Sequence, residues 1–133
     1  MNLLDENFPE DQLPLLKERH IPFRRIGHEV ACWGVKDAEI IPLLHRLQGV
    51  TFFTQDRDFF KATLCHPAYC LVWLDVRADD DAYFLRHFLK HSVFNTSARR
   101  MGLVARVHHD GVDFWQRNRA ALRHVRWIRT TEP

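Results

Sequence analysis

Short apolar segments alternate with helix-like segments along the first 95 residues, and this alternation constrains the fold more than any other feature. Such alternation is typical of α/β domains, in which right-handed crossovers build a mostly parallel sheet. The predicted strands are residues 1–4, 23–26, 50–54 and 70–74. Helical patterns open near Asn7, cover residues 37–48 and begin again at Asp79, with Asn7 and Asp79 as candidate caps.

The period of the pattern changes after residue 102. Residues 103–107 and 112–115 flank Asp110-Gly111, which is a strong hairpin signal, and a last strand is expected near Val125. A chain of 133 residues forms one domain in this interpretation. Its core covers about residues 1–98, and a basic β-hairpin extension covers about residues 99–133.

Composition excludes several classes of protein. With 46% apolar and 27% charged residues, the chain has the make-up of a globular domain rather than a disordered one. No apolar run approaches the roughly 20 residues that span a bilayer, and the start of the chain lacks a basic n-region. The three cysteines form no CxxC pair. We therefore expect a cytoplasmic protein with reduced thiols and no membrane partner.

Charge is distributed unevenly. The window from Arg99 to Arg129 holds eight arginines against Asp110 and Asp113, whereas the net charge of the whole chain is only +2. A cationic flank beside an anionic remainder suits a phosphate-binding surface next to a metal site. An acidic protein partner or a merely solvated face would account for the same charge pattern.

Acidic residues fall where the predicted strands end. Asp5, Asp56 and Asp58 follow the first and third strands, and Asp37 and Glu39 begin the helix after the second. These positions converge on one edge of a parallel sheet. Clustered carboxylates require a cation, and oxygen ligands favour Mg²⁺ or Mn²⁺, which would support phosphodiester hydrolysis. Taken singly, each acid is explained as well by a helix cap or a turn.

Three segments together resemble the PIN-like domain family. They are Leu3-Leu4-Asp5-Glu6-Asn7-Phe8-Pro9, Lys36-Asp37-Ala38-Glu39-Ile40 and Phe53-Thr54-Gln55-Asp56-Arg57-Asp58-Phe59. Their order and spacing match the family pattern over residues 1–75. The resemblance implies a three-layer α/β/α domain that binds Mg²⁺ or Mn²⁺ and hydrolyses RNA. Many relatives are toxins of toxin–antitoxin pairs.

The resemblance also assigns roles to individual residues. The predicted catalytic and metal-binding residues are Asp5, Asp37, Asp56 and Asp58. The predicted supporting residues are Glu6, Glu39, Thr54 and Asn7, of which Thr54 would orient a carboxylate through a hydrogen bond. The predicted contacts to nucleic acid are Lys36, Arg57, Arg99 and Arg100.

The expected function is thus that of a metal-dependent endoribonuclease neutralised by a small DNA-binding antitoxin, with a homodimer left open. The alternative is a catalytically silent module that binds RNA or a protein through its Arg-rich end. DNA as the substrate is a third possibility. A zinc site at His108, His109 and His124 is disfavoured, because adjacent side chains on a strand point to opposite faces.

Overall fold

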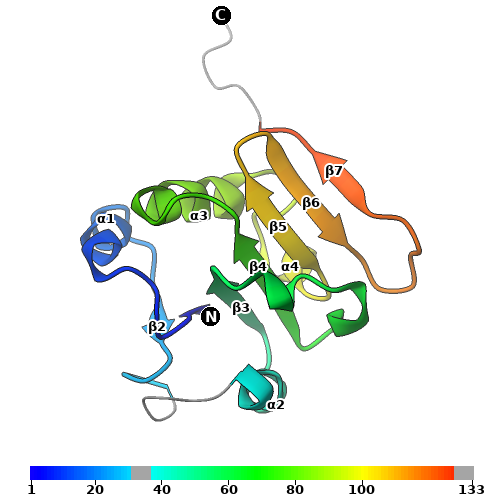
Figure 1. Ribbon diagram of the computed structural model, residues 1–133, viewed down its shortest axis with the longest axis horizontal. Helices are drawn as coiled ribbons and strands as arrows, with labels where there is room; N and C mark the ends of the chain where they lie inside the picture. The colour runs from blue at the N-terminus through cyan, green and yellow to red at the C-terminus, as the bar shows by residue number, and fades with distance from the viewer. Residues whose placement is uncertain (31–36, 128–133) are drawn as a thin grey trace, which may run out of the picture.

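The computed structural model describes residues 1–30 and 37–127, and these form a mixed α/β fold around one seven-stranded sheet (Figure 1). The sheet order is β2-β1-β3-β4-β5-β6-β7. Strands β1 to β5 are all parallel to one another. Strands β6 and β7 continue the sheet, each antiparallel to the strand before it. The strands are β1 (Asn2–Leu4), β2 (Arg24–Arg25), β3 (Val50–Thr54), β4 (Tyr69–Leu74), β5 (Val104–His108), β6 (Gly111–Trp115) and β7 (Arg123–Val125).

Strand β3 lies between β1 and β4 and is buried throughout. Its sequence, Val-Thr-Phe-Phe-Thr, is β-branched and aromatic, which suits a strand covered on both faces. Phe52 belongs to the apolar cluster on one face, and Phe53 belongs to the cluster on the other. This period-two alternation fixes the register, because a slip by one residue would exchange the two faces.

Helices cover both faces of the sheet. Helices α1 (Leu13–Glu18) and α3 (Asp81–Lys90) contribute to the cluster that contains Phe53. Helix α2 (Asp37–Leu47) packs on the opposite face through Ile40, Leu43 and Leu44. The mostly parallel α/β sheet predicted from the alternating pattern is therefore confirmed.

Two of the connections differ in handedness. The connection through α1 runs from β1 to β2, whereas the connection through α3 runs from β4 to β5, toward the opposite edge of the sheet. Both helices pack on the same face. Right-handed crossovers make up about 98% of such connections, and the expectation that all of them are right-handed is wrong for one of these two.

The C-terminal hairpin is continuous with the parallel sheet. Strand β5 pairs in parallel with β4, and β6 turns back antiparallel, as Asp110-Gly111 predicts. A short helix, α4 (Ser97–Arg100), precedes β5 and was not expected. The segment after residue 98 thus completes the sheet that the first strands begin.

Two of the three predicted helix starts differ from the structure, whereas α2 begins at Asp37 as predicted. Asn7 does not cap a helix: a 3₁₀ turn begins at Glu10, and α1 begins at Leu13, with Pro14 in its first turn. Asp79 does not cap α3 either, since it lies inside a 3₁₀ turn, Ala78–Asp80. Instead, the buried side chain of Gln12 accepts the Ala82 N–H at 3.1 Å, so the cap of α3 comes from a residue distant in sequence.

The helices formed by residues 1–30 and 37–127 are all too short or too polar to cross a membrane.

Candidate acidic pocket at the carboxyl ends of β1 and β3

The first candidate site lies where two neighbouring parallel strands end. Leu4 of β1 pairs with Phe53 of β3, so Asp5 and Thr54 follow at the same level of the sheet. The Asp5 N–H continues the ladder by donating to the Phe53 carbonyl at 3.0 Å. Parallel pairing therefore brings together residues that are about 50 positions apart in the chain, as the positions of the acids predict.

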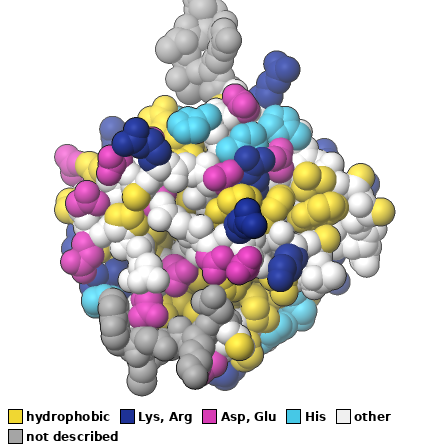
Figure 2. Space-filling view, viewed as in Figure 1, with side chains coloured by type: hydrophobic (Ala, Val, Ile, Leu, Met, Phe, Trp, Pro, Cys, Tyr) yellow, Lys and Arg dark blue, Asp and Glu magenta, His cyan; other side chains and the backbone are white. Residues whose placement is uncertain are grey.

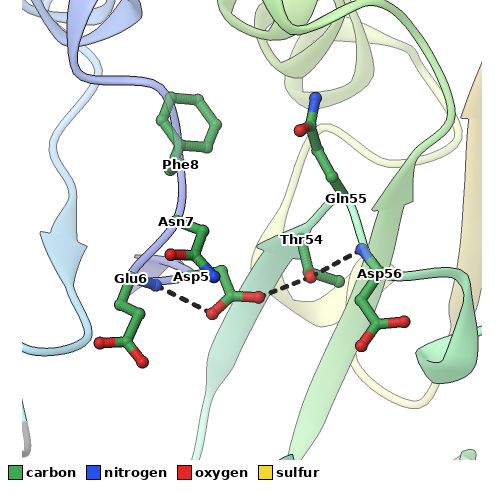
Figure 3. A pocket seen from close by; sticks show the side chains of 7 residues that line it. All are labelled: Asp5, Glu6, Asn7, Phe8, Thr54, Gln55 and Asp56. Carbon is green, nitrogen blue, oxygen red and sulfur yellow. Dashed lines mark hydrogen bonds between the residues drawn. The ribbon is translucent and has the colours of Figure 1, made fainter. Parts of the chain in front are cut away.

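A cavity of about 300 Å³ opens at this edge (Figure 3). Two predicted metal ligands, Asp5 and Asp56, line it. Three of the predicted supporting residues, Glu6, Asn7 and Thr54, line it as well. Phe8 and Gln55 complete the described lining. Figure 2 shows acidic side chains gathered near the middle of one face of the molecule.

Thr54 connects the two acidic segments. Its hydroxyl donates to Asp5 Oδ2 at 2.7 Å and accepts the Asp56 N–H at 3.0 Å. The other Asp5 oxygen, Oδ1, accepts the Glu6 N–H at 2.8 Å. With both oxygens held, the Asp5 carboxylate is fixed in orientation, as is usual for a carboxylate that binds a ligand or a metal. Thr54 is 1% exposed, so water does not compete for its hydroxyl.

Asp56 and Asp58 belong to one turn but have different positions. Asp56 Oδ1 accepts the Asp58 N–H at 2.9 Å and caps the 3₁₀ turn Arg57–Phe59. Asp56 is half-buried, whereas Asp58 is exposed and is not among the described residues that line the pocket. The buried side chain of Phe59 anchors this turn against Phe52. Asp56 is therefore better placed than Asp58 to act with Asp5.

A buried carboxylate, Asp81, supports the pocket through Gln55 and was not predicted. It is 0% exposed, and both of its oxygens accept hydrogen bonds from the Gln55 amide at 3.0 and 2.8 Å. Burial raises the pKa of Asp81 to about 7, although the hydrogen bond from Gln55 opposes this shift. Because Asp81 begins α3 and Gln55 lines the pocket, this contact links the helix to the candidate site.

Some of the predicted site residues lie elsewhere or outside the described part of the chain. The predictions for Lys36 and for the side chain of Asp37 fall outside the described residues. Glu39 is exposed on α2, and Arg57 is exposed in the turn that follows Asp56. Arg99 is exposed on α4, where it donates to the Ser92 carbonyl.

Arg100 has contacts that hold the fold together. Its guanidinium donates from Nε to the Thr51 hydroxyl at 3.0 Å and from Nη1 to the Phe94 carbonyl at 2.8 Å. Thr51 lies in the amino-terminal half of β3, whereas the pocket lies at the carboxyl end. Burial lowers the pKa of Arg100, which remains a cation. Its placement gives Arg100 a structural role away from the acidic pocket.

The donor set of the pocket fits a hard divalent cation. Asp5 and Asp56 offer carboxylate oxygens, and Asn7 offers an amide oxygen. No described Cys or His lines the cavity. Oxygen donors of this kind suit Mg²⁺ or Mn²⁺ better than softer metals.

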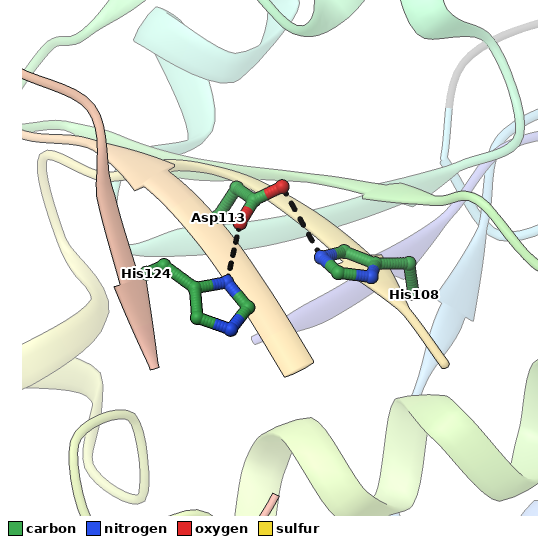
Figure 4. Close-up of side chains that lie close together, drawn as sticks. All are labelled: His108, Asp113 and His124. Carbon is green, nitrogen blue, oxygen red and sulfur yellow. Dashed lines mark hydrogen bonds and ion pairs between the residues drawn. The ribbon is translucent and has the colours of Figure 1, made fainter. Parts of the chain in front are cut away.

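A second group that could hold a metal ion lies on β5–β7 (Figure 4). It consists of His108, Asp113 and His124. The prediction that His108 and His109 point apart is correct, since His109 contacts Phe84 of α3 on the opposite face. The pair of adjacent histidines nevertheless does not reveal this group, because Asp113 takes the place of the second adjacent histidine.

Comparison of the chain with known proteins found no matching family model, no similar curated protein and no similar solved structure.

Proposed function

We propose that the protein is a metal-dependent endoribonuclease with a three-layer, PIN-like α/β/α architecture. The observation that carries this proposal is the position of Asp5 and Asp56, which line one pocket at the carboxyl ends of two adjacent parallel strands and are linked through Thr54. Clustered carboxylates in such a crevice favour a divalent cation, and a divalent cation at an acidic crevice favours phosphoryl chemistry.

Asp5 and Asp56 would hold Mg²⁺ or Mn²⁺, with Asp37 and Asp58 as the further predicted ligands. The cation, when bound, supplies charge neutralisation and an activated water for phosphodiester hydrolysis. Thr54 keeps the Asp5 carboxylate turned toward the cavity. Gln55, held by Asp81, sets the wall of the pocket on the side of α3.

An exposed cation beside the acidic turn supports an RNA substrate. Arg57 is exposed and follows Asp56 directly, so its guanidinium is available to a phosphate that enters the site. Lys36 and Arg99 remain predicted contacts.

The toxin role extends the same proposal. A ribonuclease of this kind, acting in the cytoplasm, would be neutralised by a small DNA-binding antitoxin, and a homodimer remains compatible with it. This part of the proposal rests on the resemblance of the three motifs to the PIN-like family.

The direct test is cleavage of an end-labelled RNA by the purified protein with Mg²⁺ or Mn²⁺. We expect cleavage by wild type and a loss of at least about 100-fold in Asp5→Asn and Asp56→Asn. Asp79→Asn, at an exposed acid away from the pocket, serves as the control. A matching DNA substrate decides between ribonuclease and deoxyribonuclease. Equal cleavage by wild type and Asp5→Asn would contradict the proposal.

Exposed arginines favour a second candidate function, that of a catalytically silent module that binds RNA or a protein. Arg117 and Arg119 are exposed and line a shallow cavity of about 510 Å³ beside Cys65. Filter binding of RNA without divalent cations tests this function. Binding that is lost in Arg117→Ala, together with a complete absence of cleavage, would favour the module.

A further inference from the structure

The face of the sheet opposite α3 carries a compact polar group on its last three strands. Val107, Val112 and Val125 of β5, β6 and β7 pack into the apolar cluster shared with α3. Because side chains alternate along a strand, His108, Asp113 and His124 project from the other face. Figure 4 shows these three side chains turned toward one another, and Figure 2 shows histidines gathered beside acidic and basic side chains in this part of the molecule.

The potential ligand atoms are already close together. All three lie within 4.8 Å of one another. His108 Nε2 is 3.1 Å from Asp113 Oδ2, and His124 Nδ1 is 2.5 Å from Asp113 Oδ1. Ligand bonds of about 2.0–2.1 Å in a tetrahedral site place two donor atoms about 3.3 Å apart. The group therefore needs only small side-chain movements to surround a cation.

The buried end of this group is His108 Nε2. It makes an ion-pair contact of 3.1 Å with Asp113 Oδ2, but no hydrogen bond of good geometry to any described residue. The side chain is only 14% exposed, so water has limited access to it. Buried polar atoms are almost always satisfied in folded proteins, and an exception calls for an ion or a water. A cation bound between His108 and Asp113 would satisfy this atom.

Neighbouring charges hold Asp113 in place for such a role. Arg106 donates from Nη1 to Asp113 Oδ2 at 3.0 Å and from Nε to Asp75 Oδ2 at 2.9 Å. Asp75 offsets much of the charge of Arg106, which limits repulsion of a bound cation. Hydrogen bonds of this outer kind orient carboxylate ligands in metal sites.

We propose that His108, Asp113 and His124 form a binding site for a borderline transition-metal cation of the Zn²⁺ class. Two imidazoles and one carboxylate suit Zn²⁺ and similar ions rather than Mg²⁺, and three protein ligands leave a coordination position open. This site is separate from the acidic pocket and does not depend on the ribonuclease proposal.

Binding at this site requires two protons to be rearranged. His124 must release any proton on Nδ1, and His108 must carry its proton on Nδ1 so that Nε2 can bind the cation. The Asp110 N–H now donates to His108 Nδ1 at 3.3 Å, a long hydrogen bond that opens in this step. Cation binding is therefore coupled to a change at the β5–β6 turn.

The bound cation would join three strands. Strand β7 is short, forms the edge of the sheet and has largely exposed side chains. A cation that links His124 to His108 of β5 and Asp113 of β6 would hold β7 against the rest of the sheet. Zinc should therefore slow amide hydrogen exchange in β7 more than in β3, which is buried throughout.

Zinc titration by calorimetry in competition with a chelator tests the proposal, with Co²⁺ absorption as a second readout. We expect one equivalent of Zn²⁺ to bind and the affinity to fall at least about 100-fold in His124→Ala, whose side chain is 44% exposed and tolerates truncation. His109→Ala, on the opposite face, serves as the matched control and should bind as wild type does.

The variants also separate this proposal from the ribonuclease proposal. Asp5→Asn should leave zinc affinity unchanged, and His124→Ala should leave the acidic pocket intact. Absence of zinc binding by wild type, full affinity in folded His124→Ala, or an equal loss in folded His109→Ala would each overturn the assignment of this site.

Discussion

Single side chains orient the acids of the candidate site. Thr54 is a donor to Asp5 and an acceptor from Asp56, so one buried hydroxyl sets the position of both acidic segments. Thr51, on the same strand and equally buried, is hydrogen-bonded to Arg100 instead. The two threonines therefore form a natural pair for separating site geometry from fold stability.

Thr54→Val should weaken Mn²⁺ binding by about tenfold or more, because the shape is kept while Asp5 loses its donor and Asp56 N–H its acceptor. Thr54→Ser should retain most of the affinity. Thr51→Val should lower the free energy of unfolding but leave Mn²⁺ affinity unchanged. Calorimetric Mn²⁺ titration and urea unfolding of the same samples measure both effects. A similar loss of affinity in both valine variants would refute the role given to Thr54.

Asp81 makes stability depend on pH. Burial raises its pKa to about 7, against the Gln55 hydrogen bond, and the nearby charges of Asp80 and Asp11 raise it further. A folded-state pKa above the unfolded value of about 3.9 means that the protonated form is favoured on folding. This contribution to stability is complete below about pH 4 and is lost as the pH rises toward about 7.

Asp81→Asn should therefore be more stable than wild type at pH 8, by about 3 kcal/mol or less. The amide oxygen of Asn can still accept from Gln55, so the contact to the pocket is kept. Urea unfolding at pH 5, 6, 7 and 8 measures the slope, and Asp79→Asn, an exposed acid, should follow wild type. The same fall in stability between pH 5 and pH 8 in Asp81→Asn and wild type would argue against this account.

At the scale of elements, the edge of the sheet depends on the close approach of the β7 backbone to Gly111. Its φ is +142°, and a Cβ there would lie 2.0 Å from the Val125 carbonyl oxygen of β7. Gly49 also has a positive φ, of +68°, but a Cβ there would meet nothing within 4 Å. Both glycines relieve backbone strain, whereas only Gly111 also makes room for a neighbouring strand.

Gly111→Ala should detach β7 from β6 and remove the zinc affinity of the group on β5–β7, because His124 moves away with its strand. Gly49→Ala should cost only about 1 kcal/mol of backbone strain and keep zinc affinity. Amide hydrogen exchange in β7 and zinc titration of the two variants provide the measurement. Normal protection of β7 in Gly111→Ala would show that the close approach is not required.

The elements also show what can be predicted from a sequence. Strand β3 has the predicted bounds, because its residues are buried on both faces and the pattern is uninterrupted. The start of α3 was not predictable, because its cap is Gln12, which no local pattern connects to Ala82. Opposite handedness of the α1 and α3 connections also has no local signal, since it depends on which face each helix covers.

At the scale of the whole molecule, the sheet brings distant residues into two groups. The acidic pocket was predictable because acids after parallel strands must converge at one edge. Asp81 and the group on β5–β7 were not predictable, because their contacts depend on strand register and helix packing. The half-buried position of Arg100 beside Thr51 was not predictable either, because charge patterns do not show which arginines are half-buried.

We propose above all that Asp5 and Asp56 together hold a divalent cation. The most direct measurement is a calorimetric Mn²⁺ titration in a His124→Ala background. This substitution removes one ligand of the group on β5–β7, so that Mn²⁺ binding there does not contribute to the signal. We expect one equivalent of Mn²⁺ to bind, with affinity at least about tenfold lower after Asp5→Asn or Asp56→Asn and unchanged after Asp79→Asn. No Mn²⁺ binding, or equal affinity in all of these variants, would contradict the account.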